Sequence, residues 1–241
     1  MMFLRDVVAD KSCPEYRGFN TKRARESGQQ TQSKSGLVYT PFLDMPPAEP
    51  DTMKTAMVEA QRLSELTGQK LTVLTTDQQL YAVCVNVTWI DEELFKCFVP
   101  RLEGMHALMS FVGASAILMA GSGVEDVLKS TFAIVPKLLS GKKFPQNIRA
   151  LRIVVEELLR PILMDDNNNL LTVDHLEEYL DKRSKLSKTT KLWVDCLIKP
   201  VLIMMAFVRA EREGDWPLHL YAVEKMLPYF FASSHVNYAR Y

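Results

Sequence analysis

The sequence has no excess of charge of either sign, because 29 basic side chains are matched by 29 acidic ones over 241 residues. This balance disfavours a chain that is basic throughout, as many nucleic-acid binders are. With 47% hydrophobic residues, the chain is also too apolar for a disordered protein and long enough to bury a substantial core. A local basic patch remains compatible with these numbers.

Cysteine is scarce and never closely paired, since Cys13, Cys84, Cys97 and Cys196 stand far apart without a CxxC pair. This spacing argues against a disulfide framework and favours reduced thiols. Cys84, Cys97 and His106 also lack the close ligand pairs that structural zinc sites use. We therefore expect a nuclear or cytoplasmic protein without structural zinc.

Long hydrophobic runs are also lacking. The longest uncharged run, residues 105–123, contains His106 and several glycines and serines, and the run 197–208 carries Lys199 and Pro200. Both runs fit buried helices better than a bilayer. The N-terminus has no apolar stretch long enough for a signal peptide. We expect no membrane segment.

What the sequence does contain is a short α/β pattern after a polar start. Residues 1–36 have almost nothing to bury, which predicts a disordered arm. Residues 37–43 are predicted to form a strand near a sheet edge, because Pro41 cannot donate to a ladder. An amphipathic helix from Pro50 to Gly68 separates it from the β-branched strand 70–76. Strand, helix and strand in this order predict a parallel βαβ crossover.

The rest of the chain turns from this pattern to helices. Valines at period two predict a strand at 81–89, although a helix is an open alternative, and residues 97–101 fit another short strand. We expect an α/β core over 37–121 and a helical region over 122–241. The helices expected from periodicity and end signals are 104–120, 123–130, 146–163, 172–182, 186–212 and 216–232.

Five segments carry a resemblance to a known family. They are TDQQLY (76–81), PRLEGMH (100–106), GKKFPQN (141–147), EREGDW (211–216) and HVNYARY (235–241). These segments are similar to uncharacterised proteins that animal genomes encode in many copies and that are thought to derive from DNA transposons. The resemblance covers roughly residues 37–241. Members of that family extend at both ends, which implies that this chain is a fragment.

The order of parts also resembles, distantly, the ribonuclease-H-like core of hAT-type transposases. In that core, a strand ending in an acid is followed by a strand leading into a helix that carries a histidine. The corresponding positions here are Asp77 and His106, with Glu103 where the hAT pattern has a cysteine. The resemblance implies a helix-rich α/β fold, in which a partial ribonuclease-H-like mixed sheet precedes a mostly helical region.

Transposases of this class cut DNA with two divalent ions held by carboxylates, so the resemblance implies Mg²⁺ or Mn²⁺ as cofactor if the chain is active. Asp77 follows the best strand and is the favoured metal ligand, although an acid in this place also caps turns. Asp44 is either a second strand-end acid or a turn acid. Glu211 and Glu213 are candidates for a late-helix acid, against the alternative of a solvated helix end. For His106 the alternative is a core histidine.

A basic cluster formed by Lys142, Lys143, Arg149 and Arg152 fits DNA phosphates, against the alternative of a solvated helix face. The sequence thus favours a transposon-derived, transposase-like protein, with DNA strand cleavage and transfer as its ancestral activity. We expect this chain to be inactive, with DNA as partner and a possible homo-oligomer. The alternatives are a catalytically dead DNA- or protein-binding module and a gene fragment without a selected function.

Overall fold

The computed structural model describes residues 39–40, 42–132, 144–163 and 173–240, so the expected arm lies outside the described residues. The chain divides between Ala107 and Leu108 into two compact units. We call the described residues up to 107 the α/β unit and those from 108 onward the helical unit. The division falls inside a helix, upstream of the boundary at residue 121 that the sequence suggested.

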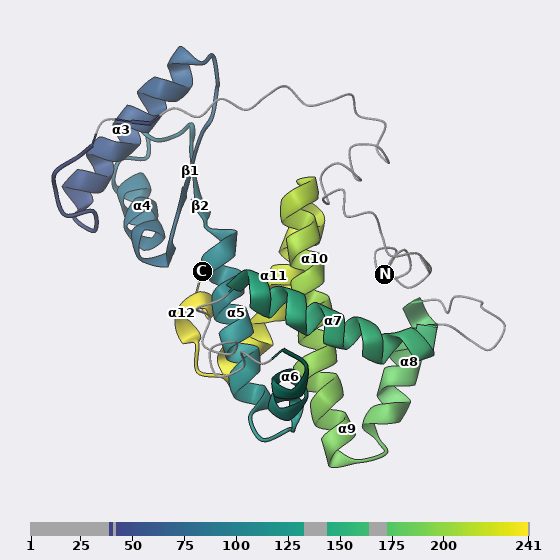
Figure 1. Ribbon diagram of the computed structural model, residues 1–241. Coiled ribbons are helices and arrows are strands. Elements are labelled where there is room, and N and C mark those ends of the chain that lie inside the picture. Colours follow the sequence, from purple (N-terminus) through teal and green to yellow (C-terminus); the bar gives the residue numbers. More distant parts are fainter. Residues whose placement is uncertain (1–38, 41, 133–143, 164–172, 241) are drawn as a thin grey trace. The chain divides into compact units, whose positions relative to one another are not determined.

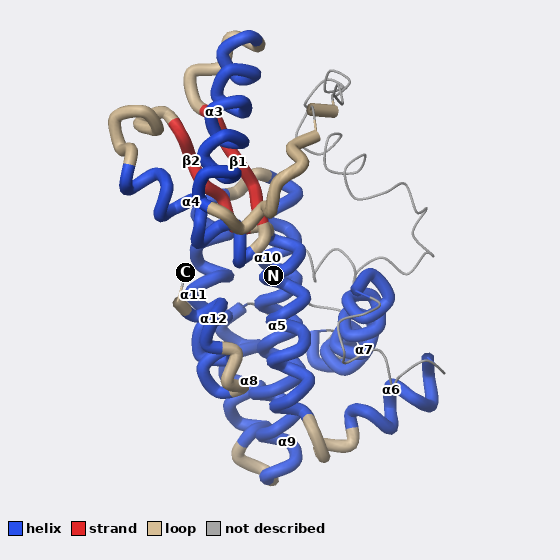
Figure 2. The backbone as a smooth tube through the Cα atoms, turned by 90° about the vertical axis from the view of Figure 1, so that its left-hand side faces the viewer, coloured by secondary structure: helices blue, strands red, loops and turns tan. Residues whose placement is uncertain are grey.

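The α/β unit is built around a two-stranded parallel sheet, which Figures 1 and 2 show beside two helices. Its elements are α3 (Pro50–Leu66), β1 (Thr72–Thr76), α4 (Gln78–Ile90), β2 (Phe98–Leu102) and the start of α5 (Gly104–Met119). The strands pair in register, from Thr72 opposite Phe98 to Thr76 opposite Leu102. The strands expected at 70–76 and 97–101 and the helix expected after Pro50 are confirmed.

One face of this sheet packs on α3 and α4. Along β1, the side chains of Thr72, Leu74 and Thr76 are buried or half-buried, and those of Val73 and Thr75 between them are exposed. This period of two is what a sheet with one covered face requires. The buried core under that face consists of Met53, Met57, Cys84, Val87, Phe95 and Phe98.

The strand predicted for residues 81–89 is wrong, because α4 occupies them. Asp77 explains the difference, since its carboxylate accepts the backbone N–H of Leu80 at 3.0 Å and so caps the helix. Cys84 and Val87 are then buried one turn apart. The valines at period two therefore did not indicate a strand. The helix that the sequence left open as the alternative is the structure observed.

The strand predicted for residues 37–43 is not found in its described part. Residues 39–40 and 42–43 are irregular, with Tyr39 88% and Phe42 90% exposed, and the remaining residues of the segment lie outside the described part. A strand needs a ladder partner, and these residues have none. In the described residues the sheet therefore has two strands rather than the expected mixed set, and Asp44 follows irregular chain rather than a strand.

The helical unit packs its helices around one large apolar core. Its elements after α5 are α6 (Val124–Phe132), α7 (Phe144–Leu163), α8 (Val173–Ser184), α9 (Lys188–Trp193), the π-helical turn η2 (Val194–Ile198), α10 (Lys199–Glu213), α11 (Trp216–Ala232) and α12 (Val236–Ala239). The core gathers side chains from α5, α7, η2, α10 and α11, including the fully buried Phe111, Val155, Leu197 and Met226. The expected helices are confirmed, and 186–212 is divided by η2.

The division of that long helix has a local cause in Pro200. The N–H of Lys199 bonds to the carbonyl of Val194, five residues back, and the next donor in such a ladder would be Pro200, which has no N–H. The carbonyl of Asp195 is therefore left without a helical donor. The hydroxyl of Tyr229 on α11 donates to it at 3.0 Å, so the widened turn is tied to the neighbouring helix.

Within the described ranges, no single helix is long and apolar enough to cross a membrane. Helices α5 and α6 reach the required length and composition only when taken together, and the chain bends by 116° between them.

Candidate functional site

The acid and the histidine that the sequence singled out both follow the carboxyl ends of the two strands. Asp77 follows β1 directly and Glu103 follows β2 directly. The N–H of Glu103 donates to the carbonyl of Thr76 at 2.8 Å, so the two acids leave the sheet at the same edge. His106 lies one turn further, in the first turn of α5. We call Asp77, Glu103 and His106 the sheet-edge site.

Asp77 has a structural task in this site. Its Oδ1 accepts the N–H of Leu80, which satisfies one of the free donors at the start of α4. The side chain is half-buried. The capping interpretation that the sequence left open is therefore an actual contact of this carboxylate.

Glu103 and His106 form a pair across the start of α5. Nδ1 of His106 contacts Oε2 of Glu103, and both side chains are partly exposed. This contact holds the imidazole in one orientation at the start of α5. Sequence reasoning did not name Glu103 as a candidate site residue.

The sheet-edge site does not fit a two-metal centre with the residues described. Two ions about 4 Å apart need several oxygen ligands between them. In the parts of the chain that the structure describes, no three His, Cys, Asp or Glu side chains converge closely enough to hold an ion. Asp44 is exposed in irregular chain ahead of α3 and is not part of the sheet edge.

The two late-helix acids lie in the helical unit, where each has a local partner. Oε1 of Glu213 accepts from Nε of Arg209 at 2.9 Å within α10. Oε1 of Glu211 lies 2.7 Å from Nδ1 of His219 on α11, an ionic contact when the imidazole is protonated. The ring of His219 stacks on Trp216, with centroids 4.9 Å apart and planes at 9°. Glu211 therefore ties α10 to α11 near the corner made by Gly214, whereas the partner of Glu213 lies in its own helix.

The basic cluster is only partly described. Lys142 and Lys143 lie outside the described residues, and Arg149 is exposed on α7. Nε of Arg152 lies 2.9 Å from Oε1 of Glu156, whose side chain is 7% exposed. That contact is ionic rather than a well-aligned hydrogen bond. Burial raises the pKa of Glu156, and the positive charges of Arg152 and Arg160 oppose the rise. Arg152 thus serves a buried acid of its own helix.

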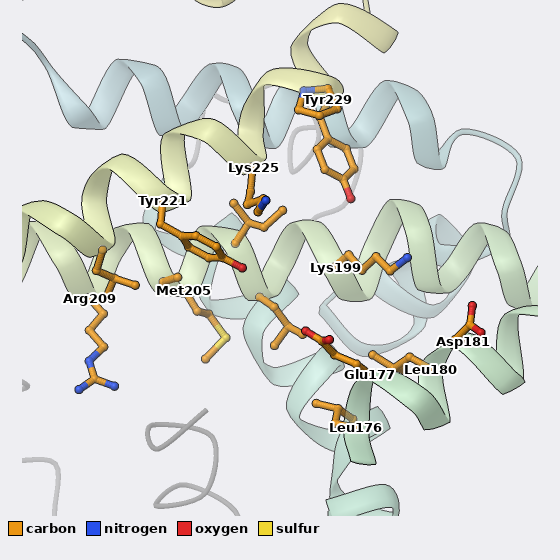
Figure 3. A pocket seen from close by; sticks show the side chains of 15 residues that line it. Leu176, Glu177, Leu180, Asp181, Lys199, Met205, Arg209, Tyr221, Lys225 and Tyr229 are labelled. Atoms are coloured by element: carbon orange, nitrogen blue, oxygen red, sulfur yellow. The ribbon is translucent and has the colours of Figure 1, made fainter. Parts of the chain in front are cut away.

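Sequence reasoning missed a groove in the helical unit. It encloses about 650 Å³ between α8, α10 and α11, and Figure 3 shows its walls. Apolar side chains of α8 and α10 form much of its lining, among them Leu176, Leu180, Leu202, Ile203, Met205 and Ala206. We call this space the α8–α10–α11 groove. The sequence indicates this groove through α10, which is apolar on a second face beside the buried face formed by Val201, Met204 and Phe207.

Charged side chains also line the groove. Lys199 and Arg209 come from α10 and Lys225 from α11, whereas Glu177 and Asp181 come from α8. Cations and acids thus stand on different helices around an apolar floor.

Fold and sites together define a helix-rich α/β protein with a short parallel sheet. The chain belongs to a family described as a domain of unknown function (DUF8702), whose model matches residues 15–170 and 163–241. No curated protein and no solved structure shows significant similarity to the chain.

Proposed function

We propose that this chain is a transposase-like protein of transposon origin, built on part of a ribonuclease-H-like core, and that by itself it does not cleave DNA. The observation that carries the proposal is the parallel β1–α4–β2 crossover with Asp77 and the Glu103–His106 pair at its carboxyl edge. Open parallel sheets place their sites at this edge.

The order of these parts supports the proposed descent. A strand ends in an acid, Asp77, and the next strand leads into a helix that carries His106 in its first turn. This is the order of parts that the resemblance to hAT-type transposases implies. The fold of the described residues is compatible with half of such a core, because β1 and β2 are adjacent and parallel.

The proposed lack of cleavage follows from the ligands. Cleavage by this class needs two divalent ions, and the sheet edge supplies two acids, of which one caps α4 and the other contacts His106. A site with this charge and geometry binds Mg²⁺ or Mn²⁺ weakly. Ancestral DNA strand cleavage and transfer are therefore proposed for the family's origin and not for this chain.

The test is DNA cleavage by the purified chain in Mn²⁺ and in Mg²⁺, beside Asp77→Asn and Asp77→Ala. Asparagine caps helices as well as aspartate does, so Asp77→Asn removes the charge and keeps α4 intact. We expect no cleavage by any of the three proteins. Metal-dependent cleavage that Asp77→Asn abolishes, without a change in stability, would show a complete metal site and overturn the proposed inactivity.

A binding module is a second candidate function, favoured by the α8–α10–α11 groove. A volume of about 650 Å³ is in the range of ligand sites, and an apolar floor flanked by charges of both signs suits an amphipathic helix of a protein partner. Lys199, Arg209 and Lys225 already pair with the nearby acids Asp195, Glu213 and Glu224, so the groove would hold the partner helix mainly through its apolar lining.

The accessibility of this groove is measured with the apolar dye 1-anilinonaphthalene-8-sulfonate. Ala206 lines the groove, so Ala206→Phe should fill it and reduce dye binding. Ala232→Phe at the exposed end of α11 is the matched control and should bind the dye as the native chain does. Equal dye binding by Ala206→Phe and the native chain would remove the support for this candidate.

A further inference from the structure

The two-stranded sheet is incomplete by the usual rules for parallel sheets. Helices α3 and α4 cover one face, whereas Val73 is 58% and Val99 42% exposed on the other. Parallel sheets are almost always covered on both faces, and two strands alone are marginal. In the described residues, no third strand pairs with either edge.

The two lateral edges of the sheet, one along β1 and one along β2, differ in the free backbone groups that they present. The N–H of Thr72 donates to the carbonyl of Cys97 at 2.9 Å, and the carbonyl of Thr76 accepts from Glu103. Backbone groups of residues 72, 74 and 76 therefore face β2, and by alternation those of Val73 and Thr75 face outward. No hydrogen bond within the described residues engages these outward groups.

The outer edge of β2 lacks a hydrogen-bond donor that a further strand would need, unlike the outer edge of β1. Pro100 stands at its central outward position and has no N–H to offer. Residues 71–76 (LTVLTT), in contrast, contain no proline, lysine or other charged residue, which are the devices that normally keep an edge strand single. The edge of β1 is therefore the one open to a further strand.

We propose that β1 pairs antiparallel with β1 of a second copy of this chain, about a twofold axis at Leu74. Val73 then lies opposite Thr75 of the second copy, and Thr75 opposite its Val73. In an antiparallel ladder these are hydrogen-bonded pairs, so the four outward N–H groups meet the four outward carbonyls. Leu74 faces its counterpart at the intervening position. The result is a four-stranded sheet in the order β2, β1, β1, β2.

A second copy is the occupant that this edge fits best. The pattern is self-complementary, as an isologous interface requires, and twofold dimers are the commonest oligomers. No charge in residues 72–76 opposes its own image. The facing side chains on the open side are β-branched valine and threonine, which pair well across strands. This inference uses the sheet alone and does not depend on the proposed relation to transposases.

The test uses two double variants of the full chain, Val73→Lys with Thr75→Lys, and Val73→Glu with Thr75→Glu. Each double variant aligns like charges across the twofold axis, so each should be monomeric at concentrations where the native chain sediments as a dimer. Mixed in equal amounts, the two variants should form a heterodimer, because every lysine then faces a glutamate. Val99→Lys, at an exposed position of β2, is the control and should still dimerise.

Hydrogen exchange provides a second readout that loss of folding would not mimic. In the dimer, the amides of Val73 and Thr75 should be protected, and in the lysine variant these two alone should exchange rapidly while the amides of residues 72, 74 and 76 stay protected. A native chain that remains monomeric with fast-exchanging Val73 and Thr75 amides would overturn the proposal. So would a dimer that survives in the lysine variant, or a mixture of the two variants that does not associate.

Discussion

Glu156 is a residue whose titration should be visible in the stability of the protein. Burial is the largest cause of its raised pKa, ahead of the opposing charges of Arg152 and Arg160. An acid whose pKa is raised in the folded state favours folding when it is protonated. Its contribution is thus complete below its usual value of 4.5 and is lost as the pH rises through the raised pKa.

We predict that Glu156→Gln reduces the fall in Tm between acidic and neutral pH, because an uncharged amide has no such ionisation. Thermal unfolding at a series of pH values checks this. The neighbour Glu157 is the control, since its hydrogen bond from Arg160 lowers its pKa and it should therefore contribute in the opposite direction. A Glu156→Gln profile that parallels the native one would contradict the prediction.

The roles and partners of single residues are where prediction from the sequence is weakest. Asp77 was singled out from the sequence as a strand-end acid, and the structure places it there while also giving it the capping bond to Leu80. Both roles have the same sequence signature, an acid between a strand and a helix. Partners far apart in the sequence, such as His219 for Glu211, leave no local signal and became visible only in three dimensions.

Among the elements, the π-helical turn η2 is the one whose contact with a neighbouring helix follows most directly from the sequence. Pro200 deprives the carbonyl of Asp195 of its donor, and Tyr229 replaces it. Burial raises the pKa of Tyr229 to about 12, with the negative charges of Asp195 and Cys196 adding to the rise, so the hydroxyl stays a donor across the physiological range.

Removal of that hydroxyl should destabilise the helical unit. We predict that Tyr229→Phe costs about 1–3 kcal/mol, because a partly buried carbonyl loses its partner while the ring keeps its edge contact with Phe111. Tyr221→Phe, at an exposed position of the same helix, should change little. Denaturant unfolding of both variants measures the difference, and equal stabilities would contradict this account of η2.

Elements with strong end signals were the ones that the sequence predicted well. Gly214 has a φ of 66° and ends α10, and Asp215 caps α11 through the N–H of Leu218, as the turn between the two expected helices suggested. The strand expected at 37–43 rested on β-branched and aromatic residues alone. Such a stretch becomes a strand only when a partner lies beside it, and a pattern within seven residues cannot supply that information.

For the whole molecule, the two units have separate cores that share no residue. Met57 is fully buried in the α/β unit and Leu197 in the helical unit. We predict two unfolding transitions. Met57→Ala should lower the free energy of unfolding of the α/β unit and Leu197→Ala that of the helical unit, each by about 2–5 kcal/mol. Calorimetry combined with hydrogen exchange assigns each transition, and a single transition that shifts with both variants would contradict the division.

The buried thiol of Cys84 has a chemical consequence for the α/β unit. Its Sγ lies 3.7 Å from the sulfur of Met57, the side chain is fully buried, and burial raises its pKa to about 11. Alkylating reagents attack the thiolate, which this environment suppresses. At neutral pH the modification of Cys84 must therefore wait for the core to open, so the alkylation rate of this one cysteine measures how often the unit opens under native conditions.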